Sequence, residues 1–200
     1  MTTAIRSWLP LVALIAMVSG CGSYPLPRTY VLGSPLEIAS GDKSEAGWPV
    51  IELRTVSVPD YLDSTDIVRR VGPNEVHASE GGRWGDRLSV GVTRALTSAL
   101  AKRLTDIVVT NRAPSLPSRR VFVEIERFEI DKDGRCVLTA RWQITAADNK
   151  IASEDARGTF VKAARSNTDA EAASAMTAAT DALADQIALA VRRSLAETSQ

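Results

Sequence analysis

Two stretches of the chain carry apolar residues at the spacing of an amphipathic helix. The first covers residues 84–104, and its apolar stripe recurs every three or four residues at Leu88, Val92, Ala95, Leu96, Ala99, Leu100 and Leu104. The second follows a capping box over residues 168–171, has an apolar face from Met176 to Val191, and ends at Arg192 and Arg193, where the helix dipole favours cations. Both stretches predict helices.

Alternation of apolar and polar residues predicts a central pair of strands. Residues 121–131 and 135–147 form this pair, joined by a tight turn over residues 131–134. The first strand changes its apolar side near Glu126 and Arg127, which predicts a β-bulge. Shorter β-rich runs predict further strands at residues 30–32, 50–58, 66–70, 75–78, 107–110 and 151–163, the last of them near the edge of the sheet.

These elements together indicate the fold class. Strands follow one another directly in the middle of the chain, so we expect an α+β fold. Its predicted core is a twisted, mostly antiparallel β-sheet with the two long amphipathic helices packed on one face.

The first residues of the chain form a targeting signal. Arg6 is followed by an apolar run that is shorter than the roughly 20 residues of a spanning helix. The run ends in Val18-Ser19-Gly20-Cys21, the pattern of a lipobox. We therefore interpret residues 1–20 as a lipoprotein signal peptide and Cys21 as the lipidated (palmitate-bearing) residue of a bacterial protein. Residues 21–29 form a tether, and residues 30–198 form a single domain.

Gly22 follows the lipidated cysteine. An aspartate at that position usually retains a lipoprotein in the inner membrane, so glycine predicts the periplasmic face of the outer membrane. The chain would be held there by its acyl chains alone, which is stable once two or more are attached.

Charge and cysteine content restrict the partners and the covalent chemistry. Lysine plus arginine and aspartate plus glutamate each number 24, and this balance does not favour binding to nucleic acid. The chain has two cysteines. With Cys21 used by lipid, Cys136 has no partner for a disulfide, and its position on an apolar strand face predicts a core residue.

Candidate catalytic groups have simpler structural interpretations. His77 is the single histidine and lies in a predicted strand without a nucleophile motif nearby. Asp131 and Asp133 open like a calcium loop, but the later ligands are missing, so a hairpin turn is favoured. Glu124, Glu126 and Glu129 together with Asp131 could offer paired carboxylates, but Glu124 and Glu126 share one face of a strand, which is more simply explained as its solvated side. We predict no enzyme activity, no cofactor and no metal site.

Several short segments resemble one known family. They are residues 56–63, with Tyr61-Leu62, residues 66–70, residues 74–76, Arg83-Trp84, and the helix from Leu88 into residues 99–101. In this order, and behind a lipobox, they are similar to the PqiC/YmbA lipoproteins, the auxiliary lipoprotein component of ABC-type transport systems. The resemblance implies a partner with MCE domains, which form conduits carrying lipid between the two membranes, and a role in intermembrane lipid transport that supports envelope integrity.

Two other functions stay open at this point. One is a stand-alone periplasmic lipoprotein that binds lipid or solute, which would need a deep apolar pocket. The other is a structural lipoprotein that forms rings, and a homo-oligomer is compatible with the transport role as well. Tyr61 and Leu62 are the candidate contacts with a partner, with the alternative that they belong to a simple turn and the core.

Overall fold

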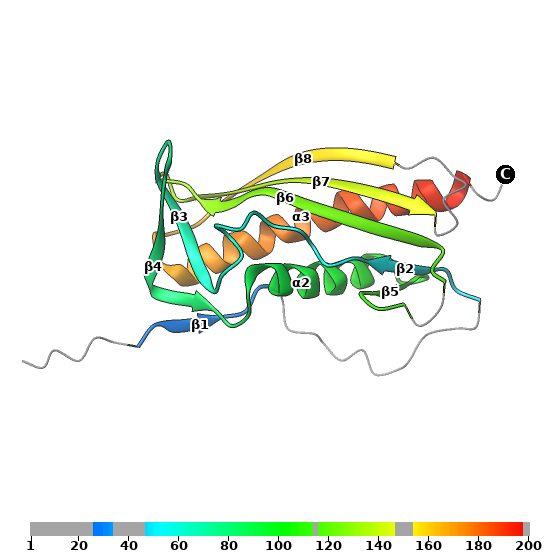
Figure 1. Cartoon of the computed structure of the whole chain (residues 1–200), viewed down its shortest axis with the longest axis horizontal. Coiled ribbons are helices and arrows are strands. Elements are labelled where there is room, and N and C mark those ends of the chain that lie inside the picture. Colours follow the sequence, from blue (N-terminus) through cyan, green and yellow to red (C-terminus); the bar gives the residue numbers. More distant parts are fainter. Residues whose placement is uncertain (1–25, 34–46, 114–115, 147–153, 198–200) are drawn as a thin grey trace, which may run out of the picture.

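The computed structural model describes residues 26–33, 47–113, 116–146 and 154–197, and Cys21 and the signal peptide lie outside them. The described chain forms one mixed sheet with two helices on one of its faces (Figure 1). The elements follow one another as β1 (Arg28–Tyr30), β2 (Val50–Leu53), β3 (Asp66–Gly72), β4 (Glu75–Trp84), α2 (Leu88–Arg103), β5 (Val108–Thr110), β6 (Arg119–Ile130), β7 (Arg135–Ala146), β8 (Glu154–Ala163) and α3 (Asp169–Ala196).

Strand β6 is the centre of the sheet. One edge of β6 pairs along its length with β7, which pairs with β8, and both ladders are antiparallel. The other edge is divided between two short strands: β2 pairs with its beginning and β3 with its end. Beyond β2 lies β5, while β4 and then β1 lie beyond β3.

The predicted α+β class is confirmed, and the sheet is mixed. Among the described strands, the pairings β1–β4, β2–β5, β2–β6 and β3–β6 are parallel. The longest ladders are antiparallel, as the alternation predicted, and β8 lies at an edge. The parallel pairings involve short strands, and an alternating pattern contains no information about strand direction.

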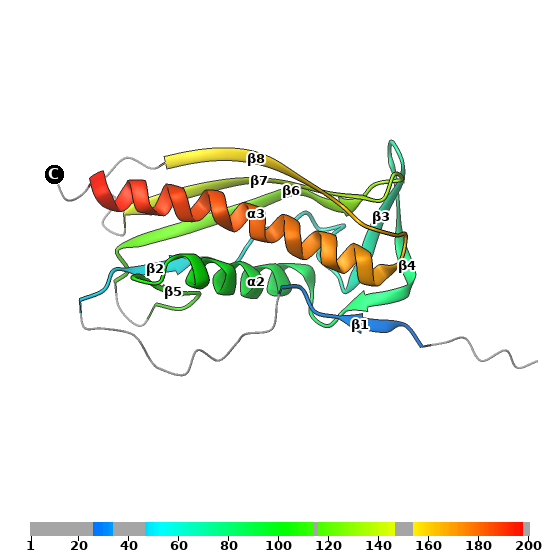
Figure 2. The same ribbon diagram turned by 180° about the vertical axis from the view of Figure 1, so that it is seen from behind.

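The helices cover one face of the sheet and enclose the core. Helix α3 packs on β7 and β8, and α2 packs against α3 and β5 (Figure 2). The predicted apolar stripes are the buried ones, and Leu96 and Leu100 of α2 meet the same core as Leu183 and Ile187 of α3. The core-facing side of α3 is rich in alanine, which leaves room for α2 to approach closely.

The first helix begins later than the sequence predicted. Trp84 was expected to start it, but Trp84 is the last residue of β4, and α2 begins at Leu88. Trp84 is buried and pairs with Tyr30 of β1. Its apolar side chain fits the helical stripe and a buried strand end equally well, so the pattern could not separate the two.

The two ends of α3 are fixed by specific hydrogen bonds. At the start, the Thr168 hydroxyl accepts from the backbone N–H of Glu171 at 3.4 Å, as the capping box predicted. The Glu171 carboxylate bonds the Arg165 guanidinium at 2.9 Å. In the last turn, the buried Arg119 of β6 donates to the hydroxyl of Ser194 at 2.7 Å and to its carbonyl oxygen, where the helix dipole favours a cation. None of the helices in the described part of the chain combines the length and the apolar character needed to cross a membrane.

The predicted bulge lies in β6. The register with β7 shifts between Ile125 and Arg127, which leaves Glu126 without an opposite residue. Before the bulge, Val121, Val123 and Ile125 face the helices, and after it Phe128 and Ile130 do. The bulge therefore turns Arg127 and Glu129 to the outer face, away from the helices.

Candidate docking site

The turn between β2 and β3 presents one of the two predicted contact residues. The backbone N–H groups of Leu62 and Asp63 donate to the carbonyl oxygen of Pro59, at 2.9 and 3.2 Å. This turn buries Leu62 completely in the core, while Tyr61 keeps 46% of its surface exposed. Of the predicted pair, Tyr61 alone is placed where a partner could touch it.

Asp63 attaches the turn to the first helix. The side chain of Arg87, the N-cap residue of α2, makes no capping hydrogen bond. Instead Asp63 accepts from the backbone N–H of Ser89 at 3.1 Å and from the Arg87 guanidinium. Burial raises the pKa of the Asp63 carboxyl, but the hydrogen bonds from Ser89 and Arg87 outweigh burial and hold this pKa below its usual value. Tyr61 is thus displayed on a turn fixed at both ends.

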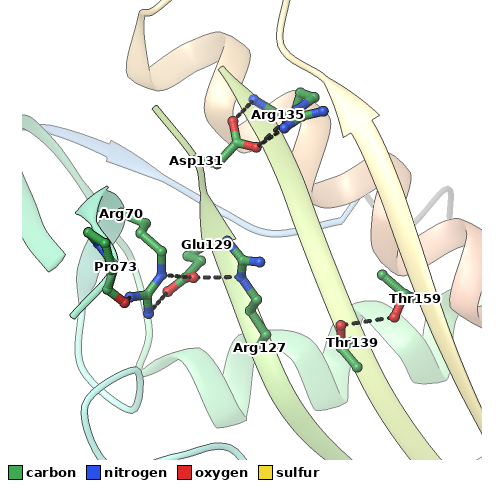
Figure 3. A network of polar contacts seen from close by, with 8 residues as sticks. All are labelled: Arg70, Pro73, Arg127, Glu129, Asp131, Arg135, Thr139 and Thr159. Atoms are coloured by element: carbon green, nitrogen blue, oxygen red, sulfur yellow. Dashed lines mark hydrogen bonds and ion pairs between the residues drawn. The ribbon is translucent and has the colours of Figure 1, made fainter. Parts of the chain in front are cut away.

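Beside this turn, two arginines share one buried carboxylate (Figure 3). Glu129 of β6 is completely buried. Arg70 of β3 approaches it with two nitrogens: Nε bonds Oε1, and Nη2 bonds Oε2 at 3.0 Å. From β6 itself, Arg127 Nε donates to Oε1 at 2.6 Å. A further nitrogen of Arg70 donates to the carbonyl oxygen of Pro73 in the β3–β4 turn, at 3.0 Å.

This cluster of Arg70, Arg127 and Glu129 carries one more positive than negative charge. Both guanidinium groups are partly exposed, and the hydrogen bond from Arg70 to Glu129 raises the pKa of the arginine further. Tyr61 lies next to the cluster: burial and the Glu129 charge raise the pKa of its hydroxyl. A neutral phenol and a surplus cation at one exposed point suit hydrogen bonding to an acidic group.

Two of the other predicted carboxylates, Glu126 and Asp131, form ion pairs, while Glu124 is exposed and lines a groove on the outer face. Glu126 binds Arg157, with both oxygens 3.0 Å from the arginine Nε, and lies 3.6 Å from Arg141. Asp131 accepts from Arg135 at 2.9 Å inside the predicted hairpin turn. Glu126 and Asp131 are therefore already bound to arginine side chains.

Histidine and cysteine are placed as follows. His77 is exposed on β4 with its ring nitrogen 2.8 Å from Glu75. Cys136 is buried, and burial raises the pKa of its thiol to about 12, so the thiol stays protonated. Within the described ranges, no group of three or more histidine, cysteine, aspartate or glutamate side chains could hold a metal ion.

Two open grooves lie on the surface. One, of about 660 Å³, crosses the outer face of β6, β7 and β8, where Phe122, Glu124, Gln143 and Asp155 contribute to its lining. The other, of about 620 Å³, lies between the β3–β4 hairpin, β1 and the start of α3, and its lining includes Arg28, Val71, His77 and Thr168. Charged side chains line both grooves.

The sequence indicated Tyr61 but not the charged cluster beside it. Arg70 is far from the other two residues in the chain. The pattern around Arg127 and Glu129 is that of an ordinary strand surface. The usable signal was the change of apolar side at residues 126–127, because it puts Arg127 and Glu129 on one face. The pairing with Arg70 depends on the parallel contact of β3 with β6, which the sequence did not predict.

The fixed turn and most of the sheet and of both helices lie in a segment that matches the sequence model of a known family. That segment covers residues 30–188, and the chain belongs to the ABC-type transport auxiliary lipoprotein components.

The known proteins that this chain resembles are distant from it in sequence. The intermembrane transport lipoprotein PqiC of Escherichia coli is 20% identical over 138 residues, which cover 69% of this chain and 73% of PqiC. Protein XCC0632 of Xanthomonas campestris has a crystal structure with TM-score 0.63 at 15% identity, covering 87% of this chain and 97% of the other. A crystal structure of an uncharacterized protein gives TM-score 0.70 at 14% identity, with coverages of 82% and 99%. These structures share the fold.

Proposed function

We propose that this protein is a non-catalytic lipoprotein of the outer membrane that serves as the docking partner of an MCE-domain protein in an intermembrane lipid transport system. The observation that carries the proposal is the family match over residues 30–188. The name of its relative PqiC, an intermembrane transport lipoprotein, supports the choice of pathway. The lipobox supports lipid anchoring at Cys21, and the glycine that follows it, Gly22, supports the choice of the outer membrane.

Within this role, Tyr61 is the proposed contact with the partner. It stands exposed on a turn that Asp63 and Leu62 hold rigid, beside the surplus positive charge of the cluster of Arg70, Arg127 and Glu129. Rigid, partly exposed aromatic side chains beside arginine are typical of residues that dominate protein interfaces. An acidic segment of the partner would complement this site.

The test combines the anchor, the partner and the phenotype. Cells that lack the gene should become sensitive to detergent, and the chain produced in them should incorporate labelled palmitate at Cys21 and co-purify with the MCE-domain protein. Tyr61→Ala should retain its melting temperature and lose the complex. Phe122→Ala, which removes another exposed aromatic ring from the outer face, is the matched control and should keep it. An unchanged phenotype together with no co-purifying MCE-domain protein would reject the proposal.

One observation favours a homo-oligomer in the same role. Among the described strands, β8 pairs only with β7, so its other edge offers backbone groups to a further strand over ten residues. A second copy could extend the sheet there and build a ring. Light scattering of the chain truncated before residue 22 tests this, and a monomer at high concentration would speak against the ring.

The grooves are open and lined with charged side chains, which does not favour the alternative of a stand-alone lipid carrier.

A further inference from the structure

The length of chain between the lipid and the fold limits how the domain can sit on its membrane. Five residue steps separate Cys21 from Leu26, the first described residue. A fully extended chain covers at most about 3.6 Å per residue, so Leu26 lies within about 18 Å of the anchored cysteine. Any surface close to Leu26 is therefore held near the phospholipid headgroups, provided that Cys21 is lipidated as proposed above.

Leu26 leads into one particular end of the elongated molecule. Strand β1, the β3–β4 hairpin and the start of α3 lie together at this end in both views (Figures 1 and 2). The end of α3, with β2 and β5, lies at the opposite end. Because α3 has 28 residues at 1.5 Å each, its two ends are separated by about 42 Å. The short tether thus distinguishes the two ends of the domain.

The side chains at the near end suit a phospholipid surface. Leu26 is 90% exposed and Val71 of the hairpin 46% exposed, although both are apolar. Val71 shares its groove with the exposed Arg28 and with His77, whose ring nitrogen lies 2.8 Å from Glu75. Apolar side chains that enter the headgroup region next to a cation such as Arg28, which can face a phosphate, are the usual composition of a membrane-contacting surface.

Ion pairs within the domain reduce the negative charge of the same groove. The carboxylate of Asp169, at the start of α3, accepts from Arg69 at 2.9 Å and from the Ser79 hydroxyl at 2.6 Å. Among the described residues, Arg28 makes no ion pair, so its charge is available to a phosphate. Glu80 also lines the groove and Glu75 pairs with His77, so the surface is amphipathic rather than strongly basic.

We infer that the end formed by Leu26, Arg28, Val71 and His77, here named the anchor end, lies directly on the phospholipid layer that holds Cys21. The domain then stands on this end, and β2, β5 and the last turns of α3 project away from the membrane. This inference rests on the proposed anchoring at Cys21, and it adds an orientation that the length of the tether alone would not impose.

Fluorescent labels at the two ends test the orientation. His77→Cys marks the anchor end and Leu189→Cys marks α3 near its far end, and both original side chains are well exposed. The buried, protonated Cys136 should not react, so labelling stays specific. The lipidated chain is placed in vesicles of phosphatidylethanolamine and phosphatidylglycerol that contain a headgroup nitroxide quencher. We expect quenching at position 77 several-fold stronger than at position 189, and equal quenching at both would overturn the inference.

A second comparison separates contact from mere proximity. Leu26→Asp together with Val71→Asp, in the His77→Cys chain, should lower quenching at position 77 toward the value at position 189. Unchanged quenching would show that the end is near the lipid without touching it, which also overturns the inference. A chain with a hexahistidine tag in place of residues 1–21, bound to nickel-chelating lipid, repeats the measurement. A missing lipid on Cys21 would therefore reject the proposed function while the orientation is still tested.

Discussion

Replacing Glu129 by glutamine tests whether the buried carboxylate holds the divided edge of the sheet together. Glu129 is completely buried and accepts hydrogen bonds from Arg70 and Arg127, which come from different strands. Glutamine keeps one acceptor, but it leaves two arginines without a counter-charge and adds a buried amide N–H₂. Removing one partner of a buried pair costs about 3–5 kcal/mol, and leaving one buried polar group unsatisfied costs about 1–3 kcal/mol.

The partial exposure of the two arginines places the expected loss of unfolding free energy between the cost of a broken buried pair and that of an unsatisfied polar group. The side chains of Arg70 and Arg127 are 26% and 36% exposed, so both can turn partly to water after the change. We therefore expect Glu129→Gln to lower the free energy of unfolding by about 3 kcal/mol. For a domain of this size that corresponds to a decrease in melting temperature of about 6–12 °C. Arg70→Gln should cost less, because Arg127 still neutralises Glu129.

Urea unfolding followed by circular dichroism measures the loss. Glu126→Gln is the matched control: it removes a carboxylate from the same strand that is also bound by arginine, but at the exposed surface, where ion pairs contribute little. A loss at Glu129 no larger than that at Glu126 would refute the reasoning, since burial is the feature that distinguishes the two. A change in the slope of the transition would instead indicate an altered denatured state.

Three further predictions follow from burial and charge. Leu62→Ala should destabilise the fold by about 2–5 kcal/mol in the same urea assay, since Leu62 is fully buried, whereas the exposed Tyr61→Ala should change it little. The folded-state pKa values of Asp63 and Asp131 lie below their usual values. The contribution of these two carboxylates to stability is therefore present above about pH 4 and lost as the pH falls through the folded-state pKa. Asp131→Asn should flatten this acid dependence of the melting temperature. A thiol reagent at neutral pH should modify Cys136 only in urea, and modification of the native chain would contradict its burial.

The sequence predicted the long elements because their patterns are strong and local. The two helices, the β6–β7 hairpin and the bulge each follow from residues close together in the chain, and the structure has all of them. The short strands were found, but their parallel pairings were not, since the contact of β3 with β6 joins Arg69 and Ile130, 61 positions apart, by a single register pair. Trp84 shows the same limit at small scale, because burial at a strand end and burial in a helix require the same side chain.

The candidate site was predictable in part for similar reasons. Tyr61 was indicated by its place in a segment that resembles the family, yet burial separates it from Leu62, and one apolar residue beside another gives no hint of which is covered. The charged cluster needs three residues from two strands, so only the folded sheet brings it together. Cys21 stays a prediction, as it lies outside the described residues.

The bulge in β6 decides which side chains in the second half of the strand face the helices. If the twelve residues of β6 alternated strictly with no bulge, Phe128 and Ile130 would exchange sides with Arg127 and Glu129. The bulge takes up one residue and so keeps the apolar side in phase along the whole strand. Deletion of the Glu126 codon should therefore remove the bulge and leave the residues on either side of it facing as they do now.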